Sequence, residues 1–122
     1  MKSFLYSTII MILFITASSS ADTIRVACIG NSITEGATLS TPLSDAYPAL
    51  LNSQLGDSFD VNNYGVGGRV MLKNGDYPIW DEVAFRRALE FDPDIVTIML
   101  GTNDSKPWNW DCLLYTSDAA DE

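Results

Sequence analysis

Three short polar turns carry the side chains of this sequence that are best suited to chemistry, and each turn follows an apolar run. The turns are Gly30-Asn31-Ser32, Gly65-Val66-Gly67-Gly68 and Gly101-Thr102-Asn103-Asp104. Ser32 offers a hydroxyl that could act as a nucleophile. Acyl transfer also needs hydrogen-bond donors directed at the oxygen on which negative charge develops. The backbone N–H groups of Ser32 and Gly68 and the carboxamide of Asn103 are donors of that kind.

The apolar runs before the turns predict three strands. Ile24–Ile29 is a short run bounded by glycine, Phe59–Tyr64 alternates apolar and polar residues, and Ile95–Leu100 is almost continuously apolar. The last pattern predicts a strand buried on both faces. Ser32–Leu43, rich in Thr, Ser and Gly, is expected to be a loop.

Two helices are expected between the strands. The first spans Ser44–Leu55, with Ser44 as its cap, Pro48 in its first turn and Gly56 as its stop. The second spans Ile79–Glu90 and ends at the turn Asp92-Pro93-Asp94. Its apolar face is expected to contain Val83, Ala84, Ala88 and Leu89. Strands that alternate with helices predict a parallel sheet and an α/β fold, which brings all three turns to one edge.

The turns also carry a resemblance to a known family. Ile29–Thr34, Asn63–Gly68 and Gly101–Asp104 resemble the first three sequence blocks of the SGNH (GDSL-like) hydrolases, in the same order and at similar spacing. The wider segment Ile98–Pro107 is similar to secreted bacterial members that act as carbohydrate or sialate O-acetylesterases. The resemblance covers Ile24 to about Trp110.

This resemblance implies a flavodoxin-like three-layer α/β/α sandwich with a parallel sheet, incomplete in this chain. It implies that Ser32 is the nucleophile and that Gly68 and Asn103 complete the oxyanion hole. The implied reaction is hydrolysis of small acyl esters, O-acetyl esters of carbohydrates above all, with no metal or organic cofactor.

The sequence departs from the family pattern in two ways. Asn31 stands where the family usually has Asp, and an Asn side chain can still bond to nearby backbone in a turn. The family also places its catalytic acid and base in a late Asp-x-x-His block, whereas this chain contains no histidine. Glu35 and Asp104 lie near the predicted edge, but a carboxylate is a weak base for a hydroxyl. Little or no esterase activity is therefore expected from these residues alone.

Several of these residues also have plain structural interpretations. Ser32 could cap a following helix, and Asn103 could satisfy the loop backbone. Asp104 is expected to stabilise its turn, and Arg69 is expected to be a solvated surface residue rather than a substrate contact. Gly65 and Gly67 are expected only to shape the turn.

The three tryptophans divide in the same way. Trp80, at the start of a predicted helix, is expected in the core. Trp108 and Trp110 follow the third turn, and stacking on a sugar stays open for both.

Two other classes of function compete with the esterase. A glycine-containing turn between strand and helix could seat a phosphate or nucleotide, but the Gly30–Gly36 segment has neither a lysine nor P-loop spacing. A non-catalytic carbohydrate-binding relative would fit the missing base.

The net charge limits the classes of binding partner, and the positions of the cysteines bear on disulfide formation. The 122 residues carry a formal net charge of −9, with 7 basic and 16 acidic residues. Such acidity argues against binding to nucleic acid or anionic membranes, which requires basic patches. The oligomeric state is left open. Cys28 lies in a predicted buried strand and Cys112 in an atypical tail, so no disulfide is expected.

The two ends differ from the middle of the chain. Lys2, the apolar stretch Phe4–Ala17 and the small residues Ser19-Ser20-Ala21 predict a signal peptide over residues 1–21, and hence a secreted or periplasmic protein. An uncleaved anchor is the alternative, although the apolar stretch is short for one. Residues 112–122 resemble a translated transposon-end sequencing adapter and are expected to be read-through, with a genuine acidic C-terminus as the alternative. Residues 22–111 are then the N-terminal part of the hydrolase domain.

Overall fold

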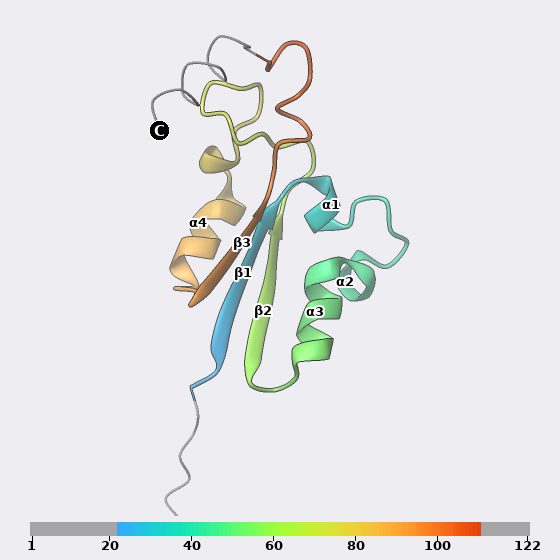
Figure 1. Ribbon diagram of the computed structural model, residues 1–122, viewed down its shortest axis with the longest axis vertical. Coiled ribbons are helices and arrows are strands. Elements are labelled where there is room, and N and C mark those ends of the chain that lie inside the picture. Colours follow the sequence, from blue (N-terminus) through green and yellow to red (C-terminus); the bar gives the residue numbers. More distant parts are fainter. Residues whose placement is uncertain (1–21, 111–122) are drawn as a thin grey trace, which may run out of the picture.

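The computed structural model describes residues 22–110, which form a three-stranded parallel sheet with helices on both faces (Figure 1). The strands are β1 (Ile24–Gly30), β2 (Phe59–Gly65) and β3 (Ile95–Met99), in the order β2-β1-β3. The predicted α/β fold with a parallel sheet is therefore confirmed. The strand bounds differ from the prediction by one residue at each carboxyl end.

The central strand β1 holds the core together because both of its faces are covered. Val26 and Cys28 point to one side, where they pack with Val61 of β2. Ala27 and Ile29 point to the other side. This two-residue alternation is the geometry of an extended strand. The Cys28 thiol is free and buried, and Cys112 lies outside the described residues.

The third strand contradicts the prediction of burial on both faces. Ile95, Val96, Ile98 and Met99 are each between 45% and 53% exposed. Within residues 22–110, β3 pairs with β1 alone and forms an edge of the sheet. The helix on that side, α4 (Val83–Glu90), packs on β1 and β2 instead. An apolar pattern reports what a strand can bury but not which element covers it.

The predicted first helix is divided in two. The structure has α2 (Pro42–Asp45) and α3 (Tyr47–Leu55), separated at Ala46, whose backbone is extended. A continuous helix would need an N–H at Pro48 and would bring its ring against the preceding turn, so the helix restarts just before this proline. Gly56 ends α3 in a positive-φ conformation, as predicted.

The loop predicted over Ser32–Leu43 is also wrong in part, because it begins with the short helix α1 (Ser32–Glu35) and runs into α2. Ser44 does not cap α3. Its hydroxyl is bonded to the Thr41 carbonyl and to Asp45 instead.

The second predicted helix is broken as well. A 3₁₀ turn, η1 (Ile79–Asp81), precedes α4, and Glu82 between them is extended. Ala88 is buried as expected, but Val83 and Leu89 are 50% and 62% exposed. Aromatic contacts accompany this arrangement: the ring centroids of Phe85 and Trp80 lie 5.1 Å apart in an edge-on contact, and those of Phe91 and Tyr64 lie 6.0 Å apart.

The helices form two layers around the sheet (Figure 1). α2 and α3 lie on one side, α4 lies on the other, and α1 sits over the carboxyl ends of β1 and β2. The loops 66–78 and 100–110 gather beyond the same ends. Across residues 22–110, no helix is long and apolar enough to cross a membrane.

Helix α1 lies so close to the end of β2 that only a glycine fits there. A Cβ on Gly65 would stand 2.3 Å from the backbone nitrogen of Glu35, well inside contact distance. The only close approach of a Cβ on Gly67 would be to the Glu35 carboxylate, at 2.8 Å, and that flexible side chain can move away.

We therefore expect Gly65→Ala to destabilise the protein by about 1–3 kcal/mol, because the backbone of α1 or β2 must shift. Gly67→Ala is the matched control and should cost much less. Urea unfolding followed by circular dichroism measures both, and equal losses in the two variants would contradict the close approach.

Candidate active site

Asn31 sets the conformation of the first turn. It is the N-cap of α1, and its Oδ1 accepts a hydrogen bond from the backbone N–H of Ile33 at 3.1 Å. The expectation that Asn maintains the turn is confirmed. The cap is Asn31 rather than Ser32, so the alternative of Ser32 as the N-cap is wrong. Within residues 22–110 the Ser32 hydroxyl makes no hydrogen bond.

The sheet register brings the second turn beside Ser32. Gly30 pairs with Gly65 on one side and with Met99 on the other, so all three strands end at one level. The N–H of Val66 donates to the Gly30 carbonyl at 3.0 Å. Ser32 Cβ lies 3.8 Å from the point where a Cβ on Gly67 would stand. The nucleophile candidate therefore borders the turn that contains Gly68.

Gly68 occupies a conformation that favours glycine, with φ of +78°. Its N–H makes no hydrogen bond to any other described residue, and the same holds for the N–H of Ser32. The Ser32 N–H is free because the first N–H groups of a helix have no partner within it. Two of the three predicted donors are thus unengaged.

Asn103 connects the third turn to the second. Its Nδ2 donates to the backbone carbonyl of Arg69 at 3.0 Å, which confirms that this amide satisfies a backbone group. A carboxamide has two N–H protons, so one remains for another acceptor. Ser32 therefore borders Gly67, Asn103 borders Arg69, and Gly68 lies between these two contacts.

Arg69 is not the solvated surface residue that the sequence suggested. Its side chain is only 27% exposed, and its Nε and Nη2 both meet Oε1 of Glu82, at 2.8 and 2.7 Å. Its Nη1 donates to the Gly67 carbonyl at 2.7 Å, and its guanidinium lies over the Tyr77 ring. Sequence analysis did not predict this contact, because Glu82 lies 13 residues away and matches no motif.

Asp104 stabilises its turn, as expected, and also holds the neighbouring loop. Its buried carboxylate accepts from the N–H of Gly101 in its own turn at 3.1 Å. It also accepts from the N–H groups of Met71 and Leu72, each at 2.8 Å. One carboxylate therefore ties the segment after Gly68 to the segment that contains Asn103.

A second polar contact joins the same loops farther out. The buried Asn109 side chain accepts from the N–H of Asp76 at 2.9 Å and donates to its carboxylate at 2.7 Å and to the Asn103 carbonyl at 3.1 Å. Trp108 Nε1 donates to the other Asp76 oxygen at 3.0 Å. The hydrogen bond from Trp108, followed by that from Asn109, lowers the pKa of Asp76. Sequence reasoning missed both Asp76 and Asn109, which lie 33 residues apart.

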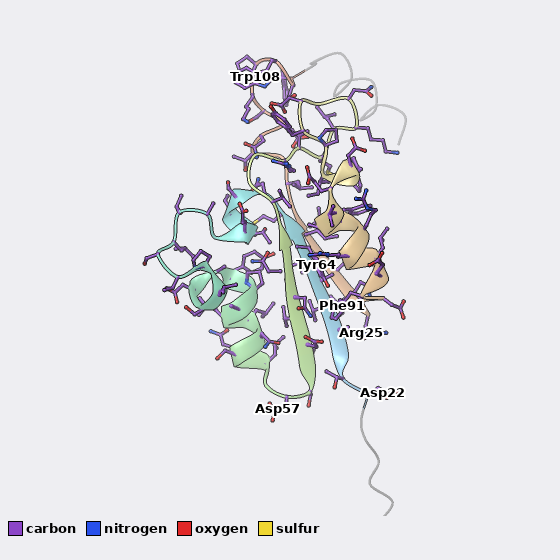
Figure 2. The ribbon with its side chains drawn as sticks, turned by 180° about the vertical axis from the view of Figure 1, so that it is seen from behind. Asp22, Arg25, Asp57, Tyr64, Phe91 and Trp108 are labelled. Atoms are coloured by element: carbon purple, nitrogen blue, oxygen red, sulfur yellow. The ribbon has the colours of Figure 1, made fainter. Side chains whose placement is uncertain are left out.

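The tryptophans lie in different environments. Trp80 packs against the core as expected, and its Nε1 donates to the Met71 carbonyl at 2.6 Å. Trp108 is 68% exposed and lies among the loops at the end of the molecule opposite Asp57 (Figure 2). Trp110 is half exposed in the same loop. The question of sugar stacking stays open for both Trp108 and Trp110.

A hollow of about 550 Å³ lies elsewhere, among α2, α3 and β2. Its lining includes Glu35, Leu43 and Asn63 but none of Ser32, Gly68 and Asn103. It is therefore separate from the candidate site. In the described part of the chain, no cluster of three or more His, Cys, Asp or Glu side chains is arranged to hold a metal ion.

The fold is an incomplete α/β/α layer structure with the candidate site at the carboxyl edge of its parallel sheet. Residues 28–120 match the GDSL-like lipase/acylhydrolase family, and this chain belongs to that family. The predicted resemblance is thereby confirmed.

A segment of 89 residues is 55% identical to an acetylxylan esterase of Xylanibacter ruminicola. The match covers 73% of this chain but only 18% of that relative. No solved structure matches the chain.

The hydrogen bonds of Asp104 predict that even a nearly isosteric substitution of this residue lowers the stability of the fold markedly. Asp104→Asn replaces one accepting oxygen by an NH₂ group that faces backbone donors, so we expect a loss of about 1–3 kcal/mol in the free energy of unfolding. Asp57→Asn, at an exposed position, is the control. Urea unfolding measures both, and similar stabilities would show that the carboxylate does not hold the loops.

The Asp76 contacts predict a pH dependence. Because the folded-state pKa lies below the ordinary value of about 3.9, their stabilisation is complete above that pH and is lost as pH falls through the lower folded-state pKa. The Tm of the wild type should therefore exceed that of Asp76→Asn at pH 6, and the difference should shrink below about pH 4. Thermal unfolding from pH 7 to pH 2 tests this, and a constant difference would contradict it.

Proposed function

We propose that this chain contributes the nucleophile and oxyanion hole of a serine esterase that removes acetyl groups from carbohydrates. The observation that carries the proposal is the set of unengaged groups at one sheet edge: the Ser32 hydroxyl and N–H, the Gly68 N–H and one proton of Asn103 Nδ2. Family membership and the acetylxylan esterase relative support the ester and carbohydrate parts.

In the proposed reaction, Ser32 Oγ attacks the acetyl carbonyl carbon while a base takes the hydroxyl proton. The carbonyl oxygen becomes an oxyanion and is stabilised by the three donors. The bond between carbonyl carbon and sugar oxygen then breaks, and the proton passes to the sugar oxygen. Water hydrolyses the acetyl-serine to acetate and restores the Ser32 hydroxyl.

The base is the part that these residues do not supply. The chain has no histidine, and no described residue bonds to the Ser32 hydroxyl. We assign the base to a His–Asp pair outside the 122 residues. We also propose that the protein is exported through the predicted signal peptide. A general base typically contributes about 10²- to 10⁴-fold to the rate, so without one turnover should be close to background.

Imidazole in solution can stand in for the missing side chain. We expect acetate release from acetylated xylan to be near background for the chain alone and to rise with imidazole. The imidazole-dependent rise should be absent in Ser32→Ala after subtraction of the protein-free reaction. Acetate is quantified by an enzyme-coupled assay.

Three results would contradict the proposal in whole or in part. Equal imidazole-stimulated rates in wild type and Ser32→Ala would exclude Ser32 as the nucleophile. Fast turnover without imidazole that disappears in Ser32→Ala would show that the chain contains its own base. Retention of xylan by Ser32→Ala with no turnover by either protein would favour a non-catalytic carbohydrate-binding relative.

A further inference from the structure

The side chain of Arg69 is turned inward, toward the turn that precedes it. Glu82 holds its Nε and Nη2, and its Nη1 donates to the Gly67 carbonyl at 2.7 Å. Both charged side chains are 27% exposed, so this ion pair is partly shielded from water. The fork geometry of a guanidinium allows these contacts at the same time, which the ammonium group of lysine cannot reproduce.

The contact with the Gly67 carbonyl has a direct effect on Gly68. The carbonyl of Gly67 and the N–H of Gly68 belong to one planar peptide, and in the trans form they point in opposite directions. A group that holds this carbonyl therefore also fixes the direction of the Gly68 N–H. A charged donor on the carbonyl also polarises the peptide, which strengthens its N–H as a donor.

The backbone of the same residue orients the other donor. The carbonyl of Arg69 accepts one proton of Asn103 Nδ2 at 3.0 Å. This bond fixes the plane of the carboxamide, and with it the direction of the remaining proton. Hydrogen bonds of Asp104 and Asn109 also hold the loop that contains Asn103.

We infer that Arg69 is a positioning residue of the oxyanion hole, with Glu82 as its anchor. Its side chain aims the Gly68 N–H and its backbone carbonyl aims the Asn103 amide, so one residue aligns both donors that do not belong to the nucleophile. This role rests on the proposed function of Ser32, Gly68 and Asn103. It differs from that of a substrate-binding cation, because the guanidinium is committed to Glu82 and the Gly67 carbonyl.

The test uses the whole chain with imidazole and a neutral acetyl ester, which offers no charge for an arginine to bind. In Arg69→Lys the positive charge remains but the fork is lost, so kcat should fall about 10- to 100-fold, with KM nearly unchanged. Glu82→Gln keeps an accepting oxygen without the charge and should give a smaller fall. Arg86→Lys, an exposed arginine of α4, is the matched control and should match the wild type.

Chemical rescue separates positioning from general stability. Millimolar methylguanidinium should restore part of kcat in Arg69→Ala, because the ion can occupy the position between Glu82 and the Gly67 carbonyl. It should not accelerate wild type or Arg86→Lys. Circular dichroism verifies the fold of each variant, and Glu82→Gln carries the test if Arg69→Ala does not fold.

The outcomes are distinct. Wild-type kcat and KM in folded Arg69→Lys and Glu82→Gln would overturn the role of Arg69 and leave the proposed function intact. A raised KM with unchanged kcat would overturn it in favour of substrate contact. Absence of Ser32-dependent hydrolysis in the unaltered chain would remove the proposed function itself, and the role of Arg69 with it.

Discussion

The shared level at which three parallel strands end is the constraint on which the site depends. β1 pairs on both sides, and Gly30 lies level with Gly65 and Met99. A slip of one residue would turn Val26 and Cys28 toward the opposite layer, so the burial of alternate residues on both faces fixes this register. The strand register alone therefore places the three turns at a common edge, independently of the side chains of the site.

Beyond that edge, polar contacts join the loops to one another. Backbone N–H groups that lie outside regular elements still need partners when water is excluded. Asp104 supplies them for Met71, Leu72 and Gly101, and the Asn109 amide does so for Asp76. These bonds join two loops that are about 30 residues apart in the chain. As a result the loops that carry Gly68 and Asn103 are held together, although much of their surface is exposed.

The groups that the proposed reaction needs are not all supplied by the same part of the sequence. In the proposal, the nucleophile and the donors come from the three described strands and their turns, and the second and third turns are joined by the hydrogen bonds of Asn103 and Asp104. Such donors stabilise charge best when they are aligned in advance, because nothing then has to reorganise as the charge develops. The proton acceptor is a separate part, and in the proposal it is supplied from elsewhere.

Local chemistry was enough to predict the elements and the turns. The apolar runs identified all three strands to within a residue, the alternation with helices identified the parallel sheet, and Gly56 marked a helix end. The motifs of the turns were enough to recognise the family. Each of these depends on neighbours along the chain, and so the sequence displays it directly.

Tertiary structure decided which groups are covered and how the turns are joined. β3 carries the most apolar pattern, yet within residues 22–110 it pairs with β1 alone and is about half exposed, since α4 packs on the other two strands. Arg69 resembled a surface residue until Glu82 and the Gly67 carbonyl were found against it. Partners of this kind are chosen by distance in space, and no local pattern encodes a contact made across the fold.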